Sequence, residues 1–247
     1  MSGHSEWASI KHKKAKTDAA RGKVFTKLIR EITVAAREGG GDLETNPRLR
    51  LAVQTAKDSN MPGDNIQRAI KKGTGELEGV HFEEFSYEGY GPAGVALLID
   101  VLTDNKNRTT AEVRHALSRH HGNLGEAGCV AWNFETKGVI RVNKSRCDEE
   151  ALMESSLNAG AEDVREEADC FEVYTRPSQL LAVSEALKAG NIPYDSAAVE
   201  KLPKTLVSVN GEEANRILKL MEVLEDLDDV QRVSANFDIP DELLGQD

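Results

Sequence analysis

Residues 137–199 read KGVIRVNKSRCDEEALMESSLNAGAEDVREEADCFEVYTRPSQLLAVSEALKAGNIPYDSAAV, and this stretch decides the fold of the second half of the chain. Its apolar periodicity and turn residues predict strand 139–142, helix 148–158, strands 162–166 and 170–175, helix 178–189 and strand 194–199. The order βαββαβ is the split βαβ pattern of a ferredoxin-like domain. We therefore expect such a domain over residues 136–204.

The segments on either side of this stretch form a second pattern of strands and helices. Strands are predicted at 82–87, 95–102, 130–134, 205–209 and 231–237, and helices at 109–120 and 212–227. Residues 95–102, VALLIDVL, are apolar except for Asp100, which is typical of a central strand. These elements predict an α+β domain of residues 79–135 plus 205–247, into which the ferredoxin-like unit is inserted.

The first 78 residues have helical periodicity instead. Residues 17–38 place Phe25, Leu28, Ile29 and Ile32 on one face of a helix. A second helix opens at Asn46–Pro47, and a third follows residues 61–64, with Gly73 as its expected stop. The fold class expected for the 247 residues is α+β: an N-terminal three-helix domain, residues 1–78, followed by two ferredoxin-like α/β sandwich domains, the third inserted in the second.

Charge is distributed unevenly along the chain, whose formal net charge is −11. Residues 1–78 hold 15 Lys and Arg against 10 Asp and Glu, whereas the remainder holds 16 against 32. Outward-facing cations on a single helix are usually solubilising, but three basic helices preceded by a lysine-rich arm favour binding to a phosphate backbone. The candidate nucleic-acid-binding residues are Lys11, Lys13, Lys14, Lys16, Arg21, Lys23, Lys27, Arg30, Arg48, Arg50, Arg68, Lys71 and Lys72.

The acidic remainder offers one weaker anion site. Residues 103–109, TDNKNRT, follow the central strand and lead into a helix N-terminus, where Lys106, Asn107 and Arg108 could hold a phosphate or carboxylate. Asp104, Asn105 and Asn107 are also ordinary turn and capping residues, and this structural role is slightly favoured. RNA recognition on the inserted sheet is not expected, because its third strand, residues 169–174, is acidic.

No pattern of catalysis or metal binding is present in the sequence. The GxGxxG match at residues 89–94 feeds a strand rather than a helix, so a turn between strands explains its glycines. The cysteines Cys129, Cys147 and Cys170 have no CxxC spacing, and no apolar run is long enough to cross a bilayer. We expect a cytoplasmic protein with no catalytic residues, no cofactor and no metal.

Several motifs in order resemble one known family. They are Gly3-His4-Ser5, Trp7-Ala8, DAARGKVFTKLIREITVAAREGGGD, NPRLRLAV, NIQRAIKKGTG, YEGYGP, TDNKNRT, AEVRHALS and AGAEDV. The chain resembles the YebC family, which includes the mitochondrial translational activator of cytochrome c oxidase, along nearly its whole length. Glu6, Leu43 and the pair His120-His121 depart from the usual pattern. Glu6 weakens the basic arm.

The resemblance implies a non-enzymatic protein with the domain plan given above. It also implies either a DNA-binding transcriptional regulator or a ribosome-associated translation factor that relieves stalling at proline-rich stretches. We expect a regulator of gene expression that binds DNA or ribosomal RNA through its basic helices. A protein-interaction adaptor with an acidic functional surface, and an enzyme or ligand sensor near residues 104–108, are the alternatives. The sequence does not distinguish a DNA target from an RNA target, because contacts with phosphates carry no information about the bases.

Overall fold

The computed structural model describes residues 18–239, and the side chains of residues 22–239. The chain forms two compact units, Met1–Phe134 with Pro203–Asp247, and Glu135–Leu202. In sequence, the second unit lies between the two segments of the first. The confirmed fold class is mixed α/β, with an N-terminal helical region followed by sheet domains. Within residues 18–239, no helix has the length and apolar character required to cross a membrane.

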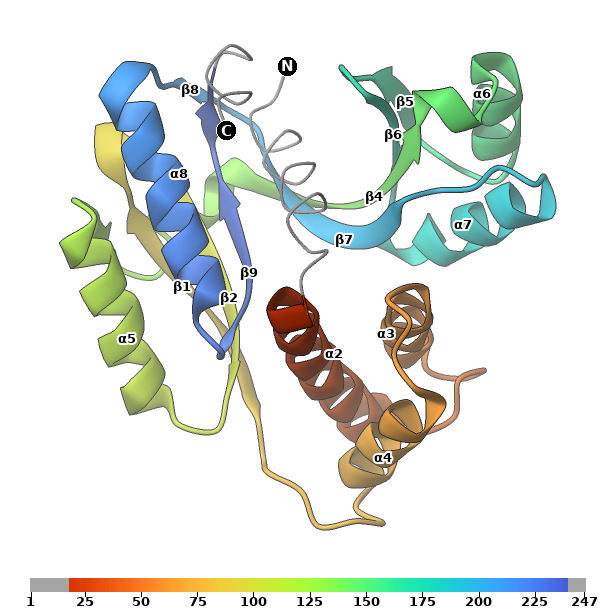
Figure 1. The fold of residues 1–247 in the computed structure, drawn as a ribbon, viewed down its shortest axis with the longest axis horizontal. Helices are drawn as coiled ribbons and strands as arrows, with labels where there is room; N and C mark the ends of the chain where they lie inside the picture. The colour runs from red at the N-terminus through yellow and green to blue at the C-terminus, as the bar shows by residue number, and fades with distance from the viewer. Residues whose placement is uncertain (1–17, 240–247) are drawn as a thin grey trace. The chain divides into compact units, whose positions relative to one another are not determined.

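Among the described residues, the larger unit begins with three helices, which form what we call the head. They are α2 (Asp18–Gly39), α3 (Pro47–Asp58) and α4 (Gly63–Thr74) (Figure 1). Their apolar stripes meet in one core that includes Ile32, Leu49, Val53 and Ile66. The side chain of Asn46 caps α3 by accepting a hydrogen bond from the Leu49 N–H, as expected for Asn before Pro.

The end of α4 differs from the expectation. Gly73 is not the stop: it is a buried residue inside α4, where a Cβ would meet the carbonyl oxygen of Thr33 and, at 2.7 Å, the Cβ of Ala36. The helix ends at Gly75, which has a φ of 84° in the left-handed region. Gly73 is therefore required for close packing of α4 on α2.

The rest of the larger unit, residues 83–134 and 203–239, is called the body. Its sheet has the order β3-β1-β2-β9, formed by β1 (Glu83–Tyr90), β2 (Ala96–Thr103), β3 (Asn123–Leu124) and β9 (Val230–Ala235). Helices α5 (Lys106–Arg119) and α8 (Gly211–Asp226) lie on one face of this sheet (Figure 1). Leu97 and Ile99 of β2 pack in the core shared with these helices, while Ala96 and Leu98 pack with Val130 on the other side. Strand β2 is apolar from Ala96 to Ile99 because both its faces are covered there.

Two predicted strands of the body are wrong or shortened. Residues 131–133 form a 3-10 turn, and the strand that follows, β4, starts only at Phe134. The strand expected at 205–209 is reduced to β8 (Val207–Ser208), which pairs in parallel with β10 (Phe237–Asp238) outside the main sheet. The glycines of residues 89–94 do form a turn between β1 and β2, where Gly94 has a φ of 74°. The short 3-10 turns are Pro92–Gly94, Ala131–Asn133, Lys144–Arg146 and Pro177–Gln179.

The inserted unit has the predicted ferredoxin-like order. Its elements are β4 (Phe134–Asn143), α6 (Glu149–Asn158), β5 (Asp163–Glu166), β6 (Cys170–Thr175), α7 (Leu180–Ala189) and β7 (Ser196–Pro203). The sheet order β5-β6-β4-β7 places the first and third strands of the unit at its centre. Buried Arg141 of β4 binds Glu172 of β6 through Nε at 2.8 Å and both carboxylate oxygens of Glu200 of β7 at 2.7 and 2.9 Å. Part of the negative charge of the third strand is thus neutralised within the sheet.

Candidate nucleic-acid interface

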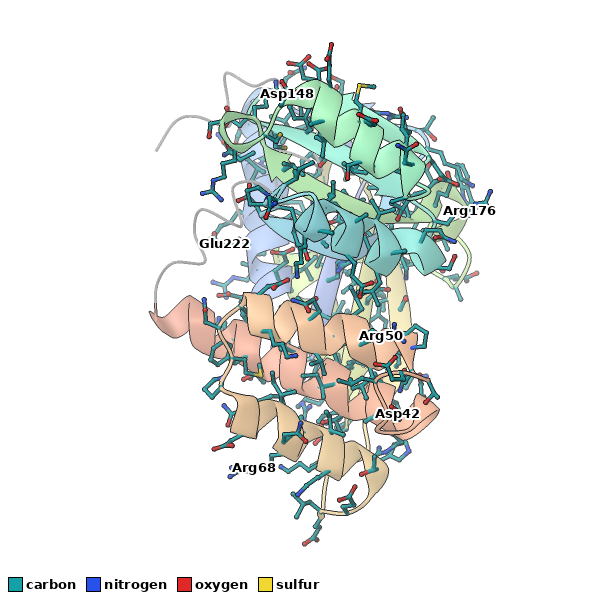
Figure 2. All side chains as sticks on the ribbon, turned by 90° about the vertical axis from the view of Figure 1, so that its right-hand side faces the viewer. Asp42, Arg50, Arg68, Asp148, Arg176 and Glu222 are labelled. Atoms are coloured by element: carbon teal, nitrogen blue, oxygen red, sulfur yellow. The ribbon has the colours of Figure 1, made fainter. Side chains whose placement is uncertain are left out.

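The outer side of α4 carries three cations that we call the cation face: Arg68, Lys71 and Lys72. Their spacing of three and four residues puts them on one side of the helix, while Ile66, Ala69 and Ile70 face the head core. Figure 2 shows Arg68 projecting from α4 away from α2 and α3. Among residues 22–239, none of the three cations has a carboxylate within ion-pair distance. The cation face is therefore open positive charge.

The basic side of α2 is arranged differently. The candidate residues Lys23, Lys27 and Arg30 contact residues 225–229 of the body, here called the acidic turn, and Lys23 alone of the three stays exposed. The contacts are an ion pair of Lys23 Nζ with Asp226 Oδ1 at 2.8 Å, a hydrogen bond from Lys27 Nζ to the Glu225 carbonyl oxygen at 2.8 Å, and one from Arg30 Nη1 to the Asp228 carbonyl oxygen at 2.6 Å. The amphipathic pattern located these cations correctly but could not show that an acidic partner lies opposite them.

Asp229 is the centre of this contact, and only 2% of its side chain is exposed. Its Oδ1 accepts from Arg30 at 2.8 Å; its Oδ2 accepts from Arg108 at 2.7 Å, Thr109 at 2.7 Å and Thr103 at 3.0 Å. Burial by itself raises the pKa of this carboxyl, but the hydrogen bonds from the two arginines and two threonines outweigh burial and lower the pKa below its ordinary value. Asp229 is thus a buried, fully ionised carboxylate.

The candidate anion site at residues 106–108 already faces this carboxylate. Arg108 forms ion pairs with Asp229 at 2.7 Å and with Asp104 at 2.8 Å, and these hydrogen bonds raise its pKa. The side chain of Asn105 caps α5 by accepting from the Arg108 N–H, so the helix starts at Lys106 rather than 109. The Lys106 ammonium lies 4.8 Å from the ring centre of Phe85, and Asn107 is exposed. The arrangement favours the structural role of this segment.

Two further candidate arginines hold the head together. Arg48 forms ion pairs at 2.8 Å with Glu31 and Glu38 of α2 and with Glu84 of β1. Burial lowers the pKa of Arg48, but the carboxylates of Glu31 and Glu84 raise it by more. The net effect is a raised pKa. Arg50 donates to the carbonyl oxygens of Leu43 and Glu44 in the loop before α3 (Figure 2). Both arginines are engaged by the protein itself.

The remaining predicted residues are not covered. Lys11, Lys13, Lys14 and Lys16 lie outside the described residues. Arg21 belongs to α2, but its side chain is likewise not described. Their role in binding stays a prediction.

Comparison with known proteins now places the chain. A family model described as the TACO1/YebC protein N-terminal domain matches residues 5–76, and one described as the TACO1/YebC second and third domain matches residues 82–237. The chain belongs to the TACO1/YebC family. The resemblance noted in the sequence is thereby confirmed.

Relatives in this family carry the same name. A protein of Desulfatibacillum aliphaticivorans is 60% identical over 100% of both chains, and one of Geobacter sulfurreducens is 57% identical over 98% of both; each is named a probable transcriptional regulatory protein. A crystal structure of a conserved hypothetical protein from Aquifex aeolicus has 52% identity and a TM-score of 0.85, covering 94% of this chain and 96% of that one. The names of the relatives support a regulatory role.

Asp229 is the site residue of this TACO1/YebC protein that sequence reasoning missed. A signal was present, since residues 225–229 contain four carboxylates beside a helix end, and α2 offers a matching row of cations. No metal cluster accompanies it: within the described part of the chain, no group of three or more His, Cys, Asp or Glu side chains is placed to hold an ion.

Proposed function

We propose that this protein is a non-enzymatic, cytoplasmic regulator of gene expression that binds the backbone of DNA through its head. The observation that carries the proposal is the cation face of Arg68, Lys71 and Lys72: Arg68 and Lys71 are exposed, Lys72 is half-buried, and none of the three has a carboxylate partner among residues 22–239. Clustered lysines and arginines on one helix face gain affinity for phosphates by releasing counterions. The sequence adds further candidate cations at Lys11, Lys13, Lys14, Lys16 and Arg21.

The head cations divide into two groups in this proposal. The cation face binds phosphate, whereas Lys23, Lys27 and Arg30 fasten the head to the acidic turn. This division differs from the sequence-based expectation, in which all of these cations are candidates for binding nucleic acid. A net charge of −11 does not oppose this proposal, because charge acts locally. Part of the negative charge, the acidic turn, is paired with the α2 cations, whereas the α4 cations have no such partner.

The test compares full-length variants by fluorescence anisotropy with a labelled 20-base-pair DNA duplex. The triple variant Arg68→Glu, Lys71→Glu, Lys72→Glu should weaken binding roughly tenfold or more, because three phosphate contacts become repulsions. The matched control reverses three exposed cations of the body, Arg114, Arg119 and Arg216. We expect the control to bind like the unaltered protein. Equal affinities of both triple variants would contradict the proposal.

The same titration with a ribosomal RNA hairpin addresses the translation-factor alternative. Phosphate contacts are shared by DNA and RNA, so a cation face alone serves either target. If the protein binds the hairpin more tightly than the duplex, and the cation-face variant loses this preference, the result would support a translation factor rather than a transcriptional regulator. Preference for the duplex would support DNA binding.

A protein-interaction adaptor is favoured by one separate observation, on α6 of the inserted unit. Met153 and Leu157 are 39% and 48% exposed one turn apart, and the exposed carboxylates of Glu150 and Glu154 flank them. An apolar pair within an acidic helix face fits a basic amphipathic segment of another protein. The double variant Met153→Ser, Leu157→Ser should then lose a protein partner in crosslinking from cells while keeping DNA binding.

A further inference from the structure

Trp132 is the most exposed of the large apolar side chains in the described part of the molecule, with 67% of its surface accessible. It lies in the 3-10 turn Ala131–Asn133 of the body, at the place where the sequence predicts a strand. Burying a tryptophan side chain is strongly favourable, so an indole that is two-thirds exposed to solvent indicates a binding surface.

The turn before Trp132 is held by a carboxylate of β1. Glu88 accepts three backbone hydrogen bonds, from Gly128 at 2.6 Å, Val130 at 2.7 Å and Ala131 at 2.8 Å. Charge-assisted bonds of this kind are stronger than neutral ones. The backbone that carries Trp132 is therefore fixed from its N-terminal side.

The turn is fixed equally well on its C-terminal side. The Asn133 side chain accepts from the Thr205 N–H at 3.0 Å and from the Thr205 hydroxyl at 2.6 Å, and its amide donates to the Thr205 carbonyl at 3.2 Å. The Lys204 N–H donates to the Asn133 carbonyl at 2.7 Å. A ligand that binds Trp132 thus meets a preorganised surface and orders little of it.

The indole ring itself has no unmet polar group. Its Nε1–H donates to the Cys129 carbonyl at 2.9 Å, within the same turn. What the side chain offers to a ligand is its flat aromatic face. This chemistry selects a flat apolar or π-electron partner rather than a hydrogen-bonding one.

A cation is bound to the backbone of Trp132. The Lys204 ammonium donates to the Trp132 carbonyl oxygen at 3.0 Å, its side chain is exposed, and among residues 22–239 it forms no ion pair. An exposed aromatic side chain together with a lysine held at the same turn is a combination with which proteins bind single-stranded nucleic acid, one group stacking on a base and the other contacting its phosphate.

We propose that Trp132 and Lys204 form a binding site for an unpaired nucleobase and its adjoining phosphate. The proposal rests on the proposed function, since it assumes a nucleic-acid ligand, and it adds a preference for single strands. A base inside a duplex is stacked and paired on both sides, so its face is inaccessible to an indole. The head would bind any phosphate backbone, and Trp132 would select strands with unpaired bases.

A protein partner fits these residues less well. Leu206 is the other large exposed apolar side chain in this part of the body, and two side chains fall far short of the roughly 800 Å² that each partner buries in a stable protein interface. The acidity of the body does not forbid a local contact, because charges more than about 8 Å away are largely screened at physiological salt.

The chain contains two tryptophans, Trp7 and Trp132, so the variant Trp7→Phe makes Trp132 the sole tryptophan reporter. We would titrate this full-length variant with a dye-labelled 12-nucleotide oligo-dT and, separately, with a 12-base-pair duplex. Anisotropy of the dye reports overall binding, and the emission of Trp132 in unlabelled samples reports stacking. Oligo-dT should quench Trp132, and the duplex should leave its emission unchanged.

Substitutions then test affinity. Trp132→Ala should weaken oligo-dT binding roughly tenfold and duplex binding hardly at all, because only the single strand stacks. Lys204→Gln should make the salt dependence for oligo-dT shallower by about one contact. Leu206→Ala is the matched control for lost apolar surface and should bind normally. Circular dichroism of each variant verifies that it is folded.

The outcomes separate this inference from the proposed function. If oligo-dT binds by anisotropy but neither quenches Trp132 nor responds to Trp132→Ala, the stacking site is refuted and nucleic-acid binding by the head stands. If neither nucleic acid binds, both proposals fall. Equal quenching by the duplex would overturn the single-strand preference.

Discussion

Asp229 shows most clearly how one residue joins parts of this protein that are distant in sequence. Its carboxylate accepts from Arg30 of α2 and from Arg108 of α5, and two buried threonines complete its hydrogen bonds. Removing one member of a buried, hydrogen-bonded ion network is costly because the remaining charges are left without partners. Even if Arg30 moved away, Arg108 and the threonines would still hold the carboxylate, so the body can keep this site without the head.

Asp229→Asn should lower the free energy of unfolding of the larger unit by about 3 kcal/mol at pH 7. The measurement is urea unfolding followed by circular dichroism. Asp228→Asn is the matched control, since its side chain is exposed, and should change the free energy by less than about 0.5 kcal/mol. A loss as small as that of the control would show that the network contributes nothing.

The stability difference between Asp229→Asn and the unaltered protein should also depend on pH. The folded-state pKa of Asp229 lies below the unfolded value of about 3.9, so its stabilisation is complete above that pH and is lost as pH falls through the folded pKa. The difference between Asp229→Asn and the unaltered protein should therefore be constant from pH 5 to 7 and shrink in the acid range, roughly below pH 4. A difference that grew on acidification would contradict the lowered pKa.

At the scale of single residues, the sequence predicts positions better than partners. The helical period places Lys23, Lys27 and Arg30 correctly on one face, because that period is a local property. Their partners, residues 225–229, lie about 200 positions away along the chain. A local sequence pattern cannot predict a contact between residues so far apart. The same holds for Arg141 and Glu200, which meet only when β4 pairs with β7.

At the scale of elements, helix α4 combines a buried side that fits closely on α2 with an exposed side of open charge. The close fit depends on Gly73, which leaves room for the Thr33 carbonyl and for Ala36. Periodicity predicted the helix and its two faces, but a glycine that ends a helix and a glycine that lets two helices approach look alike in sequence. The turn at 131–133 was misread as a strand for a similar reason, since its short apolar run is compatible with either.

Gly73→Ala should destabilise the larger unit by about 2 kcal/mol, because the added methyl group meets backbone and a fixed Cβ rather than a flexible side chain. Gly63→Ala, at the first residue of α4, adds the same group where nothing lies within 4 Å and should be close to neutral. Thermal unfolding by circular dichroism compares the two. Equal stabilities would show that the α2–α4 contact relaxes freely.

At the scale of the whole molecule, the sequence predicts the units because each carries its own periodicity, and it predicts the sign of the charge in each part. It does not show which basic residues remain available. The segments 1–78 and 79–247 differ by 21 charges, from +5 to −16, yet part of that contrast is used internally where α2 meets the acidic turn. Open charge on the described head is concentrated on α4, and the proposed nucleic-acid binding depends on it.

The most direct test of this claim is the salt dependence of binding to duplex DNA. If about six phosphates are contacted, the slope of log K against log salt should be near −5. The neutral variant Arg68→Gln, Lys71→Gln, Lys72→Gln should make the slope shallower by about 2.7, since each lost contact removes about 0.9. The control with Gln at 114, 119 and 216 should keep the full slope. A cation-face variant with the slope of the unaltered protein would contradict the claim.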